Sequence, residues 1–181
     1  MRVIGIDPGK TGGLVMIEHD GAVLVWDMPT YQEARTGKTL KGKAKAPKVK
    51  VDVPRLAEIL KTATRESETI VYIERQWTWP GEGAVQSFNH GEQYGRIIGM
   101  LAMRGVPFET PTAQAWQKEF GVAKPKGSKT TKGVSYAKAS ALFPGVTLKT
   151  ERGRILDGRC DALLIAEYGR RKHGGNRPLT S

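Results

Sequence analysis

Near its N-terminus the chain reads Val3-Ile4-Gly5-Ile6-Asp7-Pro8-Gly9, an apolar run that ends in an acid and a turn. Such a run, closed by proline and glycine, predicts a buried strand that leads into a tight turn. Two further strand-like runs, 13–17 and 22–26, lie on either side of the turn signal His19-Asp20-Gly21. The three runs together predict an antiparallel meander.

The next strand-like run, Thr69-Ile70-Val71-Tyr72-Ile73, ends at Glu74 and follows a predicted helix. That helix begins near Asp52 and continues to about Ala63, with apolar residues repeating at helical spacing. A helix between two strands makes a crossover connection, which returns the chain to a parallel strand. We therefore expect run 69–73 to lie beside the first strand and parallel to it.

The second half of the chain predicts one more strand and several helices. In chain order, we expect a helix from Ser87 to Met103, a strand at 106–108, a short helix capped by Thr112 that carries Trp116, a helix at 136–143 and a last helix from Asp157 to about Arg171. We interpret residues 1–181 as a single α/β domain with a five-stranded mixed sheet, flanked by helices.

The charge of the chain points to a polyanionic partner. It has 29 Lys and Arg against 18 Asp and Glu, a formal net charge of +11. Nucleic acid is the leading partner for such an excess, although the same charge could serve only solubility. Two acid-free basic segments, about 34–51 and 122–133, have the composition of exposed loops. We expect phosphate contacts from their lysines, namely Lys41, Lys43, Lys45, Lys48, Lys50, Lys124, Lys126, Lys129 and Lys132.

Several classes of protein are disfavoured by the sequence. Cys160 is the single cysteine, so neither an intrachain disulfide nor a thiolate zinc site can form. No apolar stretch approaches the roughly 18 residues of a membrane span, and Asp7 interrupts any signal-like run, so a cytoplasmic protein without a membrane partner is expected. The histidines His19, His90 and His173 lack ligand spacing and are interpreted as structural or surface residues.

Four acids form the candidate catalytic centre. Asp7 and Glu74 end two predicted parallel neighbours, and ligands of open α/β sheets bind at such strand ends. Asp157 and Asp161 are four residues apart, which places them on one face of the last helix. Hard oxygen ligands suit Mg²⁺ or Mn²⁺, and a pair of such ions can hold a scissile phosphate. The alternative is that the acids are turn residues and a solvated helix face.

The motifs, taken in order, resemble the RuvC-type Holliday junction resolvases of the ribonuclease H-like superfamily. The resemblance rests on the segment from Ile4 to Gly13, on Tyr72-Ile73-Glu74 and on Asp157-Gly158-Arg159-Cys160-Asp161 with the apolar run that follows it. It implies a homodimer that binds four-way branched DNA and makes paired symmetric nicks during recombination and repair. Each subunit would use Asp7, Glu74, Asp157 and Asp161 to hold two Mg²⁺ ions, with Mn²⁺ as a substitute.

The resemblance also assigns a dimerisation role to the predicted helix 87–103, whose Gly91, Gly95 and Gly99 would admit a second helix. The alternative is that this glycine face packs on the sheet of its own chain. It assigns DNA stacking to Trp77, three residues after Glu74, and Trp79 follows as either a second such residue or a core residue. The chain departs from many bacterial members in the four-residue spacing of its last two acids, with Gly158 at the usual acidic position. This pattern is closer to phage-type members.

Three other functions are compatible with parts of the sequence. Asp7 and Gly9, with Thr11, Gly12 and Gly13, also resemble the phosphate hairpin of actin-like sugar kinases, but that fold needs a second such domain. A junction-binding protein without catalysis would keep the basic segments and have no need of the acids. A related nuclease acting on forks, flaps or RNA–DNA hybrids would share the metals and the fold.

Overall fold

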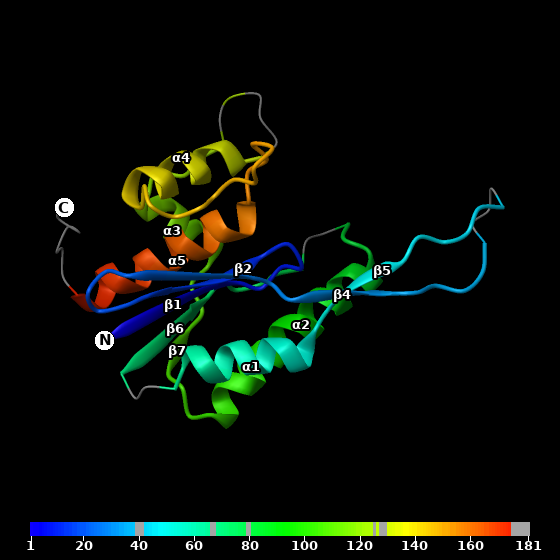
Figure 1. The fold of residues 1–181 in the computed structure, drawn as a ribbon, viewed down its shortest axis with the longest axis horizontal. Coiled ribbons are helices and arrows are strands. Elements are labelled where there is room, and N and C mark those ends of the chain that lie inside the picture. Colours follow the sequence, from blue (N-terminus) through cyan, green and yellow to red (C-terminus); the bar gives the residue numbers. More distant parts are fainter. Residues whose placement is uncertain (39–41, 66–67, 79–80, 125, 127–129, 175–181) are drawn as a thin grey trace.

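A computed structural model describes residues 1–38, 42–65, 68–78, 81–124, 126 and 130–174 (Figure 1). Its centre is a five-stranded sheet in the order β3-β2-β1-β6-β7. The strands of this sheet are β1 (Arg2–Asp7), β2 (Gly13–Ile17), β3 (Val23–Asp27), β6 (Thr69–Ile73) and β7 (Phe108–Glu109). A separate two-stranded sheet contains β4 (Thr30–Glu33) and β5 (Lys48–Val51). The helices are α1 (Val53–Ala63), α2 (Ala84–Met103), α3 (Ala113–Glu119), α4 (Lys132–Leu142) and α5 (Asp157–Gly174).

The meander and the crossover are both confirmed. Strand β1 pairs antiparallel with β2, with Asp7 opposite Gly13, and parallel with β6, with Ile6 opposite Ile73. Helix α1 supplies the crossover, and its N-terminus is capped by Asp52, whose Oδ1 accepts a hydrogen bond from the backbone N–H of Arg55 at 3.0 Å. The predicted α/β class with a five-stranded mixed sheet is therefore correct.

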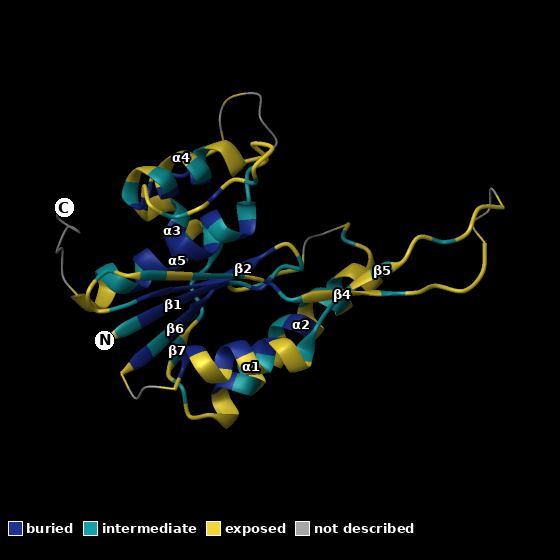
Figure 2. Cartoon of the chain, in the orientation of Figure 1, coloured by how far each residue is buried: buried dark blue, intermediate teal, exposed yellow. Residues whose placement is uncertain are grey.

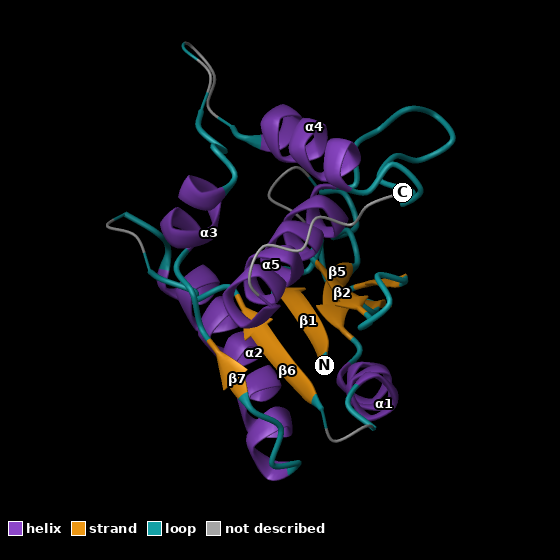
Figure 3. Ribbon diagram, turned by 90° about the vertical axis from the view of Figure 1, so that its left-hand side faces the viewer, coloured by secondary structure: helices purple, strands orange, loops and turns teal. Residues whose placement is uncertain are grey.

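Helices cover both faces of the sheet, because the side chains of β1 alternate between them. Ile4 and Ile6 belong to the core cluster that includes buried residues of α1 and α2, and Val3 belongs to the cluster that includes buried residues of α5. Burial is concentrated in the sheet and in the helix surfaces turned toward it (Figure 2). The side view shows α5 on one face and α2 on the other (Figure 3).

Helix α5 lies unusually close to the sheet because glycines stand at the contact points. A Cβ on Gly5 would lie 2.2 Å from the carbonyl oxygen of Ala162, and one on Gly169 would lie 2.3 Å from the ring of Tyr72. The run Ala162–Ala166 is fully buried against the sheet. This packing fixes the start of α5, which carries two of the candidate acids, relative to the end of β1.

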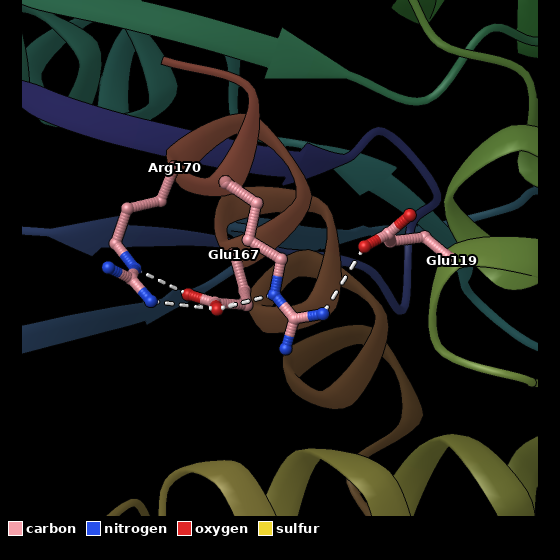
Figure 4. Close-up of polar contacts among 4 residues, drawn as sticks. Glu119, Glu167 and Arg170 are labelled. Atoms are coloured by element: carbon pink, nitrogen blue, oxygen red, sulfur yellow. Dashed lines mark hydrogen bonds and ion pairs between the residues drawn. The ribbon is translucent and has the colours of Figure 1, made fainter. Parts of the chain in front are cut away.

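The far half of α5 is held by a buried carboxylate. Glu167 is 2% exposed and accepts hydrogen bonds from Arg170 at 2.6 Å and 2.9 Å (Figure 4). Arg171 also donates to Glu167, at 2.9 Å, and reaches Glu119 at the end of α3, at 3.3 Å. The network therefore joins the last turns of α5 to α3.

The basic segment 34–51 is not entirely loop, which corrects the sequence interpretation. Its last four residues form β5, which pairs antiparallel with β4, and Lys38 bridges Ala44 farther out. The alternation Lys48-Val49-Lys50-Val51 has the period of a strand, but the high lysine content obscured it. The described residues of 30–51 form an arm that extends away from the body in Figure 1.

Three element boundaries also differ from expectation. Strand β7 begins at Phe108 rather than Val106, because its pairing with β6 is limited to Phe108 and Glu109. Helix α2 begins at Ala84 instead of Ser87. Helix α4 begins at Lys132, so this lysine is helical and not part of a loop. No helix in the described part of the chain is long and apolar enough to cross a membrane.

Candidate active site

The structure brings the four predicted acids to one edge of the sheet. Asp7 ends β1, and Glu74 directly follows β6, its backbone N–H donating to the carbonyl of Ile6 at 3.0 Å. Asp157 opens α5, and Asp161 follows one turn later. Asp7 is oriented by the backbone N–H of Gly9, which donates to Oδ1 at 3.0 Å.

Burial and like charge raise the pKa values of three of these carboxyls. Burial raises the pKa of Asp7, the hydrogen bond from Gly9 lowers it, and the charge of Asp157 raises it further. The pKa of Glu74 rises to about 7, first through burial and then through the charge of Asp7. The pKa of Asp161 also rises to about 7, through burial and then through Asp7, Glu74 and Asp157. The acids therefore form one electrostatic cluster that favours a shared proton or a cation.

Two oxygens of this cluster have no hydrogen-bond partner among the described residues. Oδ1 of Asp157 and Oδ1 of Asp161 are buried and unsatisfied among the described residues. Buried carboxylate oxygens without donors are costly unless something else coordinates them. No three acidic, histidine or cysteine side chains of the described residues are already gathered around a common point. The donor set fits a hard cation such as Mg²⁺, around which the carboxylates would converge.

A tryptophan donates a hydrogen bond to Glu74. The sequence predicts the short helix that carries this tryptophan, but not its contact with Glu74. Trp116 is fully buried in α3, and its Nε1 donates to Oε2 of Glu74 at 2.8 Å. The side chains of Trp116 and Gln76 lower the pKa of Glu74, which partly offsets burial. Thr112 caps α3 as predicted, accepting from the backbone N–H of Ala115. No spacing signal in the sequence links Trp116 to Glu74.

Helix α4 brings a lysine and a serine to the two acids of α5. The Nζ of Lys132 donates to Oδ2 of Asp157 in an ion pair. Ser135 lies close enough to Asp161 to lower its pKa, although the buried hydroxyl has no hydrogen bond of regular geometry. Lys132, expected to contact DNA from a loop, thus begins a helix beside the acids. Because Lys132 and Ser135 are far in sequence from the acids of α5, the sequence alone does not predict these contacts.

The spacing of the last two acids has a steric cause. Gly158 packs on the loop after β1, where a Cβ would lie 2.1 Å from the carbonyl oxygen of Thr11 and 2.4 Å from the Cα of Gly12. No side chain fits at position 158, so an acid cannot stand there. Asp157 supplies the carboxylate one position earlier, with its charge acting on both Asp7 and Asp161.

Comparison with known proteins gives a consistent result for the fold. No protein-family model matches the sequence, and none of the curated proteins matches it. Among solved structures, the RuvC of Thermus thermophilus in complex with a Holliday junction substrate is similar, with a TM-score of 0.54 and 17% identity over 98% of this chain and 99% of that chain. The chain has the RuvC fold. A second structure of T. thermophilus RuvC is similar at a TM-score of 0.53 and 18% identity, over 95% of this chain and 97% of that one.

On this RuvC fold, the aromatic residue after Glu74 is exposed. Trp77 is 56% exposed, and the guanidinium of Arg75 lies 5.7 Å from the centre of its ring. An exposed tryptophan beside the acids is available for stacking on a base. Trp79 lies outside the described residues.

The described DNA-binding lysines of the sequence prediction lie mainly in the arm and in the segment before α4. Lys43 is exposed, Lys45, Lys48 and Lys50 are half-buried in the arm, and Lys124 and Lys126 are exposed before α4. Lys41 and Lys129 lie outside the described residues. Sequence reasoning missed a third group, the turn that contains Lys149, Arg152 and Arg154 just before α5, where Arg152 and Arg154 are exposed. The signal for this group was the pair of arginines around Gly153.

The exposed face of α2 carries the predicted small residues. Gly91, Gly95 and Gly99 are exposed, and a Cβ on any of them would meet nothing within 4 Å. On the same helix Phe88 is 70% exposed and Met103 is 92% exposed. The glycines therefore do not pack against the sheet of their own chain.

Proposed function

We propose that this chain is a metal-dependent endodeoxyribonuclease that resolves four-way DNA junctions by paired symmetric nicks. The observation that carries the proposal is the cluster of four mutually interacting acids, with two buried and unsatisfied oxygens, at the carboxyl ends of β1 and β6. A cluster of this kind is costly for a protein that only binds DNA, because no bound cation would offset the repulsion that remains after Lys132 pairs with Asp157.

The metal ligands in this proposal are Asp7, Glu74, Asp157 and Asp161. Mg²⁺ bound there, as two ions or with Mn²⁺ in its place, would activate water and neutralise charge on the scissile phosphate. The protein prepares the ligands, since Gly9 orients Asp7 and Trp116 orients Glu74. Lys132 places a positive charge beside Asp157, where it can also attract the DNA phosphate.

The DNA-binding role rests on charge around these acids. The arm, the segment before α4 and the turn before α5 carry exposed or half-buried cations in addition to the acid cluster, as expected for a protein that binds a polyanion. Trp77 adds an exposed aromatic ring that tolerates any base. T. thermophilus RuvC, which has a similar fold, has been solved in complex with a Holliday junction substrate.

The proposed enzyme acts as a homodimer through α2. A stripe of Phe88, Gly91, Gly95, Gly99 and Met103 lies on exposed turns of one helix, and its glycines allow a second helix to approach closely. The same patch on two copies gives an isologous contact with two-fold symmetry. Two active sites related by such an axis match two opposing strands of a junction, which accounts for paired nicks.

Substrate selectivity tests the proposal. Purified protein with Mg²⁺ would be given, in separate reactions, an immobile four-way junction, the linear duplex of the same arms, a flap and an RNA–DNA hybrid. We expect the junction to be cut fastest, with nicks at symmetric positions on opposing strands. Faster cutting of the flap or hybrid would assign the site to a different branched or mixed substrate, and tight junction binding without cutting would assign a non-catalytic role.

A further inference from the structure

A recess lies near the acids, between the arm, the start of α1 and helix α2. Its volume is about 230 Å³, and its walls come from both strands of the arm, from α1 and α2, and from the loop after β1. It belongs neither to the acid cluster nor to the exposed face of α2. The proposed metal chemistry makes no use of it.

Several cations line this recess, and two of them have no acidic partner in the part of the chain that the structure describes. Lys10, Lys48, Lys50 and Arg96 line it together with one acid, Glu92. Lys50 is paired with Glu33 at 2.7 Å, and Arg96 with Glu92 at 2.7 Å. Lys10 and Lys48 form no ion pair with any described residue. The recess therefore keeps a net positive charge, which favours an anionic group at its rim.

The rest of the lining is apolar or aromatic. Val51, Val53, Pro54 and Leu56 form an apolar part of the wall, and Tyr31 of β4 contributes a ring that is 47% exposed. Tyr31 stands opposite Lys50 in the β4–β5 pairing, so the two side chains share one face of the arm. A simple phosphate site needs neither a ring nor an apolar wall. A ligand with a flat apolar part and a phosphate would contact the cations, the tyrosine ring and the apolar wall.

The recess adjoins the catalytic loop directly. Gln93, which lines it, is buried and donates a hydrogen bond to the carbonyl of Pro8, next to Asp7. Lys10, also in the lining, is three residues after Asp7 in the same loop. A strand that passes the acids can therefore continue into the recess without leaving the surface.

We propose that this recess binds one nucleotide of a DNA strand that has left its duplex stack, with the phosphate at Lys10 and Lys48 and the base against Tyr31. The inference rests on the proposed function, because the same strand would present its scissile phosphate to the acids. Lys10, Lys48 and Tyr31 are positioning residues in this account. An unstacked nucleotide is available at a branch point and not in an intact duplex, so the recess contributes to recognition of branched DNA.

The test measures binding of a short oligothymidylate by fluorescence anisotropy, as a function of salt and in EDTA, so that no cutting occurs. Lys10→Gln and Lys48→Gln each lower the affinity and reduce the slope of log K against log salt by about 0.7, the value for one lost phosphate contact on a single strand. Tyr31→Leu lowers the affinity roughly tenfold and leaves the slope unchanged, and Tyr31→Phe restores wild-type affinity. Lys61→Gln, at the other end of α1, is the matched charge control and retains the wild-type slope.

Any one of the following results would overturn the inference: absence of oligothymidylate binding by the wild type, equal loss in the Lys61→Gln control, or unchanged binding in Tyr31→Leu. Competition by thymidine monophosphate as strong as by the oligonucleotide would show a free-nucleotide pocket and would also contradict a strand site. The outcome is separate from that of the proposed function, because oligonucleotide binding is measured without metal, whereas junction cutting is scored independently with Mg²⁺.

Discussion

The indole Nε1 of Trp116 donates a hydrogen bond to Oε2 of Glu74 over 2.8 Å, and so joins α3 to the end of β6. The indole is fully buried, whereas Glu74 keeps part of its surface accessible at the site. A rigid donor on one oxygen fixes the orientation of the carboxylate and leaves the other oxygen for a ligand. Glu74 is thus positioned by a residue far from it in the chain.

Replacing the donor tests this orientation. Trp116→Phe keeps an aromatic ring in the core and removes the hydrogen bond, so kcat for junction cutting falls by about ten- to a hundredfold, as expected for a bond to a charged group. Steady-state kinetics with Mg²⁺ measures the effect. Trp26→Phe, in β3, is the control for loss of an indole and retains kcat. An unchanged kcat in Trp116→Phe would show that Glu74 needs no such support.

The raised pKa values predict how the metal-free protein responds to pH. Glu74 and Asp161 titrate near pH 7 when folded, whereas unfolded carboxyls titrate near pH 4. Between these values the folded state binds more protons than the unfolded state. The contribution of these groups to the free energy of unfolding therefore falls as pH rises from about 4 to about 7, and it stays low above pH 7.

Asp7→Asn isolates this effect, because the charge of Asp7 raises the pKa of both Glu74 and Asp161. In EDTA the variant loses less stability than the wild type between about pH 5 and about pH 8, and at the higher pH it is more stable by on the order of 1 kcal/mol. Urea unfolding at the two pH values measures the difference. Parallel pH dependence in the two proteins would mean that the acids do not interact as described.

The sequence predicts features that depend on neighbouring residues, but not contacts between residues that are distant in the chain. Asp7 and Glu74 were identified because each follows an apolar strand, and Asp157 and Asp161 because they are one helical turn apart. The partners Trp116 and Lys132 could not be assigned, since their contacts with Glu74 and Asp157 depend on how α3 and α4 pack. The local sequence pattern predicts periodicity and the ends of strands. It does not predict which helix packs over which acid.

The arm shows a different limit. Its composition predicts a loop, and only the alternation of Lys48 and Lys50 with valines reveals a strand. Pairing with β4 stabilises β5 despite the lysines, and Glu33 opposite Lys48 and bonded to Lys50 offsets part of their repulsion. The recess between the arm and α2 follows from this pairing and could not be foreseen without it.

The buried carboxylate of α5 predicts a stability effect separate from catalysis. Glu167→Gln removes the charge that accepts hydrogen bonds from Arg170 and Arg171, and it lowers the free energy of unfolding by about 2 kcal/mol, the range for a hydrogen bond to a charged group. Urea denaturation measures the loss, and Glu151→Gln, at an exposed position, is the control with little effect. Junction cutting at a temperature where both variants are folded remains at the wild-type rate. A variant as stable as the wild type would show that the network in Figure 4 contributes nothing.

The exposed face of α2 predicts the oligomeric state. Gly95→Glu places a charged side chain where the single chain has open space, so the monomer still folds, whereas close packing of two α2 helices is blocked. Light scattering coupled to size exclusion is expected to show a dimer for the wild type and a monomer for this variant. Gln86→Glu, on another side of the same helix, remains dimeric. A wild type that is monomeric at all concentrations tested would exclude the proposed dimer.

The most direct test of the metal-dependent site measures cleavage of an immobile four-way junction and of the linear duplex of the same arms. Wild type and Asp7→Asn are compared with Mg²⁺ and with EDTA. We expect paired nicks on opposing strands of the junction for the wild type with Mg²⁺, no cutting in EDTA or in Asp7→Asn, and junction binding by both proteins. Cutting that persists in EDTA or in Asp7→Asn would contradict a metal-dependent site built on these four acids.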